Sequence, residues 1–243
     1  MLVYHQIRTE GAAPEDGDTA IGLDRFTAQM EWLAGHGYVP LSMDDSVRYL
    51  QGLLPPLAGP PVAIHLDDGW KSGLAALPVL ERFRFKATYW VIAGTGIGLP
   101  HVDWADVVAL EAHPLIDVQS HTLTHPWKPG ETLVDWVTGR TMLRGTADAA
   151  HELQESKRLL ESRLGRAVPY LAWPSGHYND ALIALAQQAG YTALLTIDDG
   201  VNVPGTTDLL RIRRTMIHGG CDITTFSRIL QDGVFRTCPA ATR

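Results

Sequence analysis

Short apolar runs alternate along the chain with stretches in which apolar residues recur every three or four positions. Several of the short runs show no polar alternation, which is typical of strands buried on both faces of a parallel sheet. The expected strands are Leu2–Tyr4, Val62–Leu66, Ala87–Ala93, Leu115–Gln119, Tyr170–Trp173, Ala193–Ile197 and Leu209–Ile217.

The stretches between these runs predict helices whose ends can be recognised. Asp24, Ser42, Asn179 and Asp222 are the expected N-caps, and Gly165 is the expected end of a long helix. The segment Trp127–Gly145 fits neither period and is expected to be a loop. Alternating strands and helices predict an α/β fold, namely a distorted or incomplete (β/α) barrel of about seven parallel strands. We expect one domain over residues 1–243.

Composition narrows the class of partner. The chain has 243 residues, of which 45% are hydrophobic and 19% charged, so it can bury a sizeable core. A formal net charge of −7 without blocks of like charge argues against nucleic acid or anionic membrane as the main partner. No apolar run reaches the roughly 18 residues of a transmembrane helix. Two cysteines, Cys221 and Cys238, are too few to indicate a redox compartment.

Two adjacent carboxylates follow the second expected strand, in the sequence LDDG. Sites in parallel α/β folds lie at the carboxyl ends of the strands. Asp67 and Asp68 leave the backbone in different directions, so one can bind a metal while the other stays available as a base. A plain turn with a helix cap is the alternative, because Asp-Asp-Gly is favourable turn chemistry.

Two histidines follow the fourth expected strand, in the sequence SHTLTHP. In a helical turn His121 and His125 share a face and can hold one ion, and Pro126 should end that turn at His125. The alternative is a pair of solvated or capping histidines. One carboxylate and two imidazoles form a recurrent ligand set for catalytic zinc and for non-haem iron(II). Because both stretches follow strands at one end of the barrel, the sequence predicts a metal site.

Further polar residues follow strands at the same end. His5 ends the first strand, and His218 near the C-terminus is a similar candidate. Either histidine can instead be a hydrogen-bonded structural residue. The side chain of His65 is expected to point away from that of Leu66 and to be a buried structural residue. The sequence WPSG, Trp173 to Gly176, reads alone as a turn.

Together these stretches resemble the polysaccharide deacetylase family, the NodB-homology or carbohydrate esterase family 4 domains, over most of the chain. LDDG is similar to the first motif, which implies that Asp67 is the catalytic base and Asp68 a metal ligand. SHTLTH is similar to the second motif, which implies that His121 and His125 bind the metal. LAWPSG is similar to the third, which implies that Trp173 and Pro174 form a wall of the substrate groove.

The opening LVYHQI resembles the circularly permuted poly-N-acetylglucosamine deacetylase branch, in which the last motif stands at the start of the chain. This resemblance implies that His5 is the general acid and that the backbone N–H of Ser175 binds the oxyanion. Trp127, next to the second motif, is a further candidate for the groove. The chain departs from the family where Ala172-Trp173 replaces the arginine that orients the base, and Arg211 and Arg213 are the candidates for that contact.

The resemblance implies a metal-dependent hydrolase that removes N-acetyl groups from an N-acetylglucosamine-containing polysaccharide, with a metal-bound water as nucleophile. Zn²⁺ is the expected ion, with Co²⁺, Ni²⁺ and Fe²⁺ as alternatives. The expected partner is an N-acetylated polysaccharide or oligosaccharide, such as an exopolysaccharide of a biofilm. A periplasmic or extracellular location is expected if a signal has been removed. The rival functions are an iron(II) oxygenase, a catalytically inactive carbohydrate-binding relative and a deacylase of another acylated carbohydrate.

Overall fold

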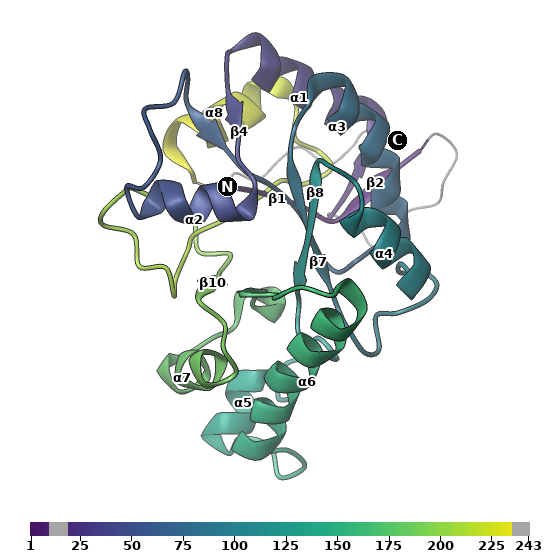
Figure 1. The fold of residues 1–243 in the computed structure, drawn as a ribbon, viewed down its shortest axis with the longest axis vertical. Helices are drawn as coiled ribbons and strands as arrows, with labels where there is room; N and C mark the ends of the chain where they lie inside the picture. The colour runs from purple at the N-terminus through teal and green to yellow at the C-terminus, as the bar shows by residue number, and fades with distance from the viewer. Residues whose placement is uncertain (10–18, 235–243) are drawn as a thin grey trace.

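The computed structural model describes residues 1–9 and 19–234. Its centre is a sheet of seven parallel strands in the order β10-β9-β8-β7-β6-β1-β11, so the expected fold class is confirmed. Figure 1 shows β7 and β8 in the middle of the molecule. The bounds of the strands are β1 Leu2–Tyr4, β6 Ile64–Leu66, β7 Ala87–Val91, β8 Ile116–Ser120, β9 Tyr170–Ala172, β10 Ala193–Leu195 and β11 Thr215–Met216.

The sheet curls until its two edges are joined by a single segment of the chain. Residues 209–212 run beside β10, with a parallel bridge between Leu195 and Ile212. Four residues after Ile212 the same segment ends β11, which pairs with β1. The expected strand Leu209–Ile217 is therefore split between two partners. This split gives the barrel its distorted form.

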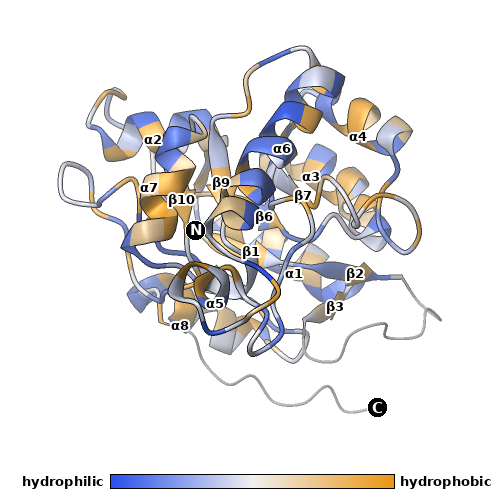
Figure 2. Ribbon diagram, turned by 90° about the horizontal axis from the view of Figure 1, so that it is seen from below, coloured by the Kyte–Doolittle hydropathy of each residue, from blue (hydrophilic) through white to orange (hydrophobic). Residues whose placement is uncertain are grey.

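Helices cover the outside of the curled sheet, as Figure 2 shows with the strands near the centre of the view. Among the described residues, α5, α6 and α7 pack together at one end of the molecule (Figure 1). No described helix combines the length and apolar character that crossing a membrane requires. The bounds are α1 Leu23–Gly35, α2 Met43–Leu50, α3 Leu77–Phe83, α4 Trp104–Glu111, α5 Leu133–Thr138, α6 Thr146–Leu164, α7 Asp180–Gln188 and α8 Ile223–Asp232.

Most of the expected helix ends are confirmed. Side chains of Ser42, Asn179 and Asp222 accept hydrogen bonds from the first turns of α2, α7 and α8, and Gly165 ends α6 with a φ of 68°. The prediction for Asp24 is wrong, because Gly22 is the N-cap of α1 and Asp24 lies inside the first turn. A carboxylate in that position still interacts favourably with the positive end of the helix dipole.

The expectation of a loop over Trp127–Gly145 is wrong in its middle, where α5 forms. Thr132 and Asp135 make a reciprocal capping box, in which each side chain accepts a hydrogen bond from the backbone N–H of the other. The helix has six residues, which is too short for a helical period to be recognised in the sequence.

Within the described residues, four further strands form two small parallel sheets outside the barrel. β2 (Gln6–Arg8) pairs with β3 (Ala20–Gly22), and β4 (Val39–Pro40) pairs with β5 (Pro61–Val62). Each has only two or three residues, so the sequence pattern did not reveal them. The sequence leaves open whether Cys221 and Cys238 form a disulfide, and Cys238 lies outside the described residues.

Candidate active site and metal centre

The candidate residues meet at the carboxyl ends of the strands. Asp67 and Asp68 follow β6, His121 follows β8, and His5 follows β1. They line one pocket of about 670 Å³, together with His125, Trp127, Trp173 and Ser175. Pro174 is buried and is absent from this lining, so the structure does not bring it to the pocket with the others.

Asp68, His121 and His125 form a convergent group. Oδ1 of Asp68 lies 3.2 Å from Nε2 of His121 and 3.3 Å from Nε2 of His125. One ligand atom from each of the three residues lies within 4.8 Å of the other two. The carboxylate and both imidazoles therefore present their donor atoms to the same small volume.

The expected helical turn between the two histidines is wrong, although their side chains still meet. Thr122 and His125 have φ angles of 67° and 53°, in the left-handed region. Thr124 donates from both its backbone N–H and its hydroxyl to the buried carboxylate of Glu152 in α6. Hydrogen bonds to α6 thus hold the loop between the histidines. The i, i+4 spacing of His121 and His125 alone does not indicate this contact.

The hydrogen bonding of His121 fits a metal ligand. Its Nδ1 lies 2.9 Å from the carbonyl oxygen of Ala172. A carbonyl only accepts, so Nδ1 carries the hydrogen, and in the neutral ring the lone pair is on Nε2, which faces Asp68. Such an outer hydrogen bond is the usual way in which a ligating histidine is oriented.

The electrostatics of the group also fit a divalent cation. Burial opposes the ionised form of Asp68, but hydrogen bonding to His121 and the charges of His5, His121 and His125 outweigh it and hold its pKa well below the usual range. Burial and the charge of His121 lower the pKa of His125 to about 4, so this ring is neutral at pH 7. Burial also opposes protonation of His121, yet the hydrogen bond to Asp68 and the charges of Asp67 and Asp68 raise its pKa.

Asp67 is bound by an arginine that the sequence analysis did not name. Two nitrogens of the Arg214 guanidinium donate to the two carboxylate oxygens of Asp67 at 2.8 and 2.9 Å, and both residues are buried. The predictions for Arg211 and Arg213 are therefore wrong. Arg211 pairs with Asp180 and Asp208 at the surface, and Arg213 donates to the backbone oxygen of Asp199.

The ion pair keeps Asp67 ionised despite its burial. Burial alone would raise the pKa of Asp67, but the charges of Arg214, His121 and His5 hold it below its ordinary value. The sequence carried one signal for Arg214 as the partner of Asp67. Side chains along a strand alternate between its two faces, so Ile212 and the buried Arg214 share one face and Arg213 lies on the other.

His5 lies beside the convergent group. Its Nε2 is 4.0 Å from Oδ2 of Asp68, and its side chain is 14% exposed. Its Nδ1 is buried and has no hydrogen-bond partner in the described part of the chain. His218 is not among the residues that line the pocket. Of the two candidate histidines, only His5 is placed for chemistry there.

The third motif forms part of the pocket wall. Ser175 has a φ of 49°, and Gly176 follows with a φ of 68°. A Cβ atom at Gly176 would lie 2.3 Å from Cγ1 of Ile197, so this tight turn requires glycine. Trp173 is fully buried and packs mainly in the core, whereas Trp127 is 54% exposed beside the pocket.

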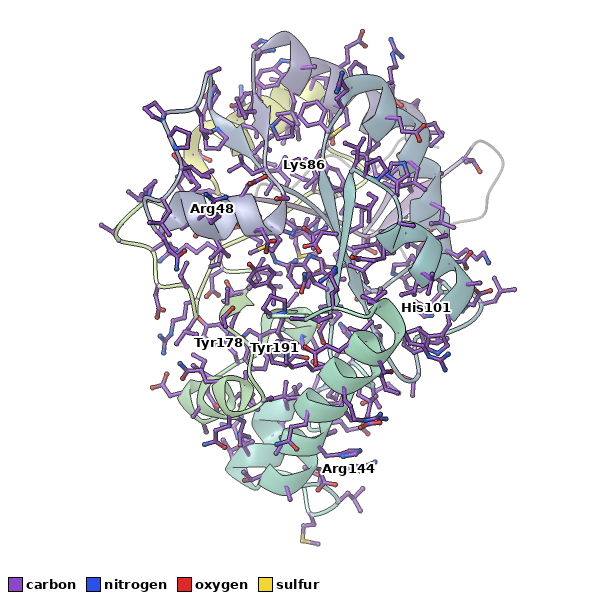
Figure 3. The ribbon with its side chains drawn as sticks, viewed as in Figure 1. Arg48, Lys86, His101, Arg144, Tyr178 and Tyr191 are labelled. Atoms are coloured by element: carbon purple, nitrogen blue, oxygen red, sulfur yellow. The ribbon has the colours of Figure 1, made fainter. Side chains whose placement is uncertain are left out.

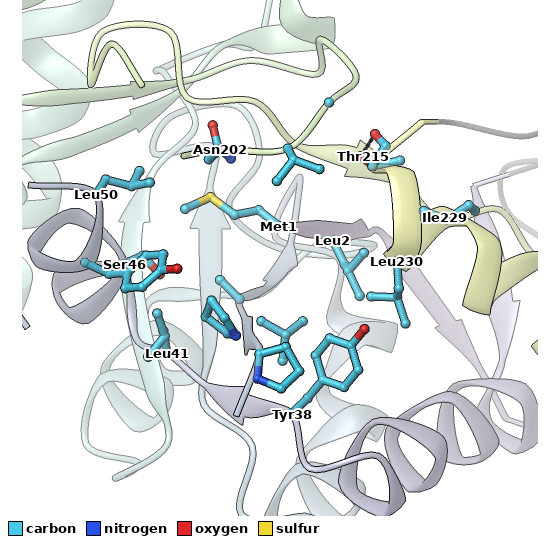
Figure 4. A pocket seen from close by; sticks show the side chains of 18 residues that line it. Met1, Leu2, Tyr38, Leu41, Ser46, Leu50, Asn202, Thr215, Ile229 and Leu230 are labelled. Atoms are coloured by element: carbon cyan, nitrogen blue, oxygen red, sulfur yellow. Dashed lines mark hydrogen bonds between the residues drawn. The ribbon is translucent and has the colours of Figure 1, made fainter. Parts of the chain in front are cut away.

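A second cavity, of about 270 Å³, lies at the amino ends of β1, β6 and β11 (Figure 4). Apolar residues such as Leu2, Leu50 and Leu230 line it, together with Tyr38 and Ser46. Its lining includes none of the residues that the sequence analysis selected for chemistry. The candidate active site is therefore the pocket at the carboxyl ends of the strands.

Comparison with known proteins gives the family. The profile of the polysaccharide deacetylase family matches residues 55–194, more than half of the chain. The chain belongs to this family, as its motifs led us to expect.

One curated relative agrees with this assignment. YxkH of Bacillus subtilis (strain 168), provisionally named a polysaccharide deacetylase, is 26% identical over 201 residues. These cover 82% of this chain and 64% of the relative, so the chain spans just under two thirds of that protein's length.

Two solved structures share the fold. IcaB from Ammonifex degensii superposes with a TM-score of 0.80 at 23% identity, covering 95% of this chain and 94% of its own. The Streptococcus pyogenes deacetylase PplD, in complex with acetate, gives a TM-score of 0.78 at 23% identity and 96% coverage of each chain. Identities this low show a common fold and leave the substrate to be argued from the site.

Proposed function

We propose that this chain is a metal-dependent hydrolase that removes N-acetyl groups from an N-acetylglucosamine-containing polysaccharide. The observation that carries the proposal is the convergence of Asp68, His121 and His125 in one pocket, with the ionised Asp67 beside them. Two carboxylates with different partners can serve two roles, because one points to the histidines and the other to Arg214.

Asp68, His121 and His125 would hold the ion. We propose Zn²⁺, with Co²⁺, Ni²⁺ and Fe²⁺ as alternatives, because this donor set suits each of them. Such an ion supplies Lewis acidity, which lowers the pKa of a water toward ~7 and polarises the acetyl carbonyl.

Asp67 would take the proton from the attacking water. Its carboxylate is ionised at neutral pH, and the two hydrogen bonds from Arg214 fix its orientation. One of its oxygens lies 3.8 Å from Nε2 of His121, so the base is next to the site where the water would be activated. A positioned base of this kind contributes roughly 100- to 10,000-fold to the rate.

Ser175 would stabilise the negative oxygen of the tetrahedral intermediate, and His5 would protonate the leaving amine. Ser175 lines the pocket, and its backbone N–H would donate to the tetrahedral oxygen, a type of contact worth about 100-fold or more. His5, when protonated, would donate to the departing glucosamine nitrogen. Its Nε2 lies 4.0 Å from Oδ2 of Asp68, and both residues line the pocket.

Aromatic rings at the mouth of the pocket favour a carbohydrate substrate. Trp127 is 54% exposed there, and Trp70 stacks on His101 in the wall. Flat apolar faces of this kind can pack against sugar rings. A polysaccharide substrate is consistent with a periplasmic or extracellular location, which we propose together with a single domain over residues 1–243.

The test is acetate release from oligomers of N-acetylglucosamine, followed with and without a chelator. We expect acetate that disappears with the chelator and returns with Zn²⁺. Release from another acylated carbohydrate alone would leave the chemistry standing and change the substrate. Metal binding without any release would favour the inactive carbohydrate-binding relative.

A further inference from the structure

We infer that Trp70 is a positioning residue, whose indole N–H holds one oxygen of Asp68 so that the other is presented to the metal ion. The inference rests on the proposed function. Nε1 of Trp70 donates to Oδ2 of Asp68 at 3.1 Å. Oδ1 of the same carboxylate is the oxygen that faces both histidines, at 3.2 and 3.3 Å.

The two oxygens of Asp68 thus have separate partners. An indole N–H donates only, and it cannot accept a proton or coordinate a cation. It therefore satisfies Oδ2 without competing for the ion. A hydrogen bond to an ionised acceptor is also stronger than one between neutral groups. The arrangement favours ligation through Oδ1 alone, which leaves coordination positions open for water and substrate.

The indole is itself held in place by the neighbouring loop. Trp70 stacks on His101 with ring centroids 4.4 Å apart and 28° between the planes, and the two residues form an antiparallel bridge. Figure 3 labels His101 next to α4, at the edge of the molecule. The backbone carbonyl of Trp70 also accepts a hydrogen bond from the hydroxyl of Tyr89.

The residues on either side of Trp70 are tied to the same loop. The N–H of Val102 donates to the carbonyl of Gly69 at 2.8 Å, and the N–H of Lys71 donates to the carbonyl of Pro100 at 3.1 Å. The ring therefore has little freedom to turn away from Asp68. The hydrogen bond to Oδ2 is pre-formed rather than dependent on the ion.

This contact has a measurable consequence for the metal. Loss of a hydrogen bond to a ligating side chain typically weakens metal affinity by about 10- to 100-fold. The substitution Trp70→Phe removes the N–H and keeps a ring that can stack on His101. The control Trp32→Phe makes the same change in α1, where Trp32 stacks on His36 with centroids 3.7 Å apart and lies outside the pocket lining.

The experiment measures affinity for Zn²⁺ by competition with a chromogenic chelator. We expect Trp70→Phe to bind about 10- to 100-fold more weakly than the wild type, and Trp32→Phe to bind equally well. The urea midpoint of the metal-free Trp70→Phe protein should stay close to that of the wild type, which separates a positioning role from a structural one.

Unchanged Zn²⁺ affinity in Trp70→Phe would overturn the inference, while a wild type that binds no Zn²⁺ would overturn the proposed function instead. If Trp70→Phe does not fold, 3-benzothienylalanine at position 70 replaces only the indole N–H by sulfur. The same weakening is expected for that protein, and wild-type affinity would refute the role of the N–H.

Discussion

The guanidinium of Arg214 makes a two-point contact with the carboxylate of Asp67, across 147 positions of sequence and in a fully buried setting. Arg214 also donates from Nε to the backbone carbonyl of Thr196, so its own position is fixed by the neighbouring strand end. The base of the proposed reaction is therefore oriented by a residue from the segment that closes the barrel. The Arg214–Asp67 pair therefore contributes both to the stability of the fold and to the orientation of the base.

Removal of Arg214 should destabilise the protein strongly. The substitution Arg214→Met leaves the Asp67 charge buried without its main partner, and breaking a buried pair in this way costs about 3 to 5 kcal/mol. Urea unfolding of the metal-free protein measures the change. The double substitution with Asp67→Asn should recover part of the loss, because the orphaned charge is then gone.

The matched control is Arg211→Met, which removes a surface arginine paired with Asp180 and Asp208. Exposed pairs contribute about 0 to 1 kcal/mol, so its free energy of unfolding should fall little. Equal losses for the two arginines would contradict the assignment of Arg214 as the structural partner of the base.

Replacement of Asp67 should separate metal binding from turnover. In Asp67→Asn the side chain keeps nearly the same shape but is a far weaker base, so acetate release should fall by roughly 100- to 10,000-fold. Bound metal, measured by elemental analysis, should remain at the wild-type level because Asp68, His121 and His125 are intact. Full activity in Asp67→Asn would show that another group is the base.

Replacement of His5 should slow the departure of the amine. We expect His5→Ala to lower kcat for an acetamide substrate by about 100-fold or more, because the leaving nitrogen then lacks its proton donor. The comparison is His218→Ala, which changes a histidine outside the pocket lining and should keep near wild-type turnover. A reversal of these two results would transfer the acid role to His218.

A pH dependence is expected at Asp117, far from the candidate active site at the other end of β8. Burial, with the charges of Asp44 and Glu111, outweighs the neighbouring Arg166 and raises the pKa of Asp117 to about 6. The folded state therefore holds this proton more tightly than the unfolded chain, in which the pKa is about 3.9. Its contribution to stability is fully present below about pH 4 and is lost as pH rises through about 6.

The test compares wild type with Asp117→Asn in urea between pH 7 and pH 4.5, both with chelator present. As pH falls from 7 to 4.5, the free energy of unfolding of the wild type should rise by about 1 to 3 kcal/mol relative to that of Asp117→Asn. Asp180→Asn removes an exposed carboxylate and should follow the wild-type profile. Parallel profiles for wild type and Asp117→Asn would mean that Asp117 does not titrate in this window.

The features of the fold that depend on local pattern were predictable from the sequence. Short apolar runs, several of them without polar alternation, predicted all seven barrel strands, and capping chemistry placed the starts of α2, α7 and α8 at Ser42, Asn179 and Asp222. The helix α5 was missed because its six residues are fewer than two turns, although the pair Thr132 and Asp135 carried a capping signal.

The site was predictable wherever residues follow strands directly. Asp67, Asp68, His121 and His5 meet because parallel strands deliver their carboxyl ends to one edge. The left-handed backbone at Thr122 and His125 was not predictable, because the loop between them is bound through Thr124 to Glu152 of a distant helix. Alternation along the expected strand separates Arg214 from Arg213, but only the closure of the barrel brings Arg214 to Asp67.

The central claim is that one ion held by Asp68, His121 and His125 is required for deacetylation. The most direct measurement titrates the metal-free protein with Zn²⁺ and follows the rate of acetate release from N-acetylglucosamine oligomers. We expect no activity before addition, then a linear rise and a plateau at about one equivalent per chain, the number that a single three-ligand site can hold. We expect no such rise for His121→Ala. Full acetate release by the metal-free wild type, or a titration unchanged in His121→Ala, would show that this ion is not required.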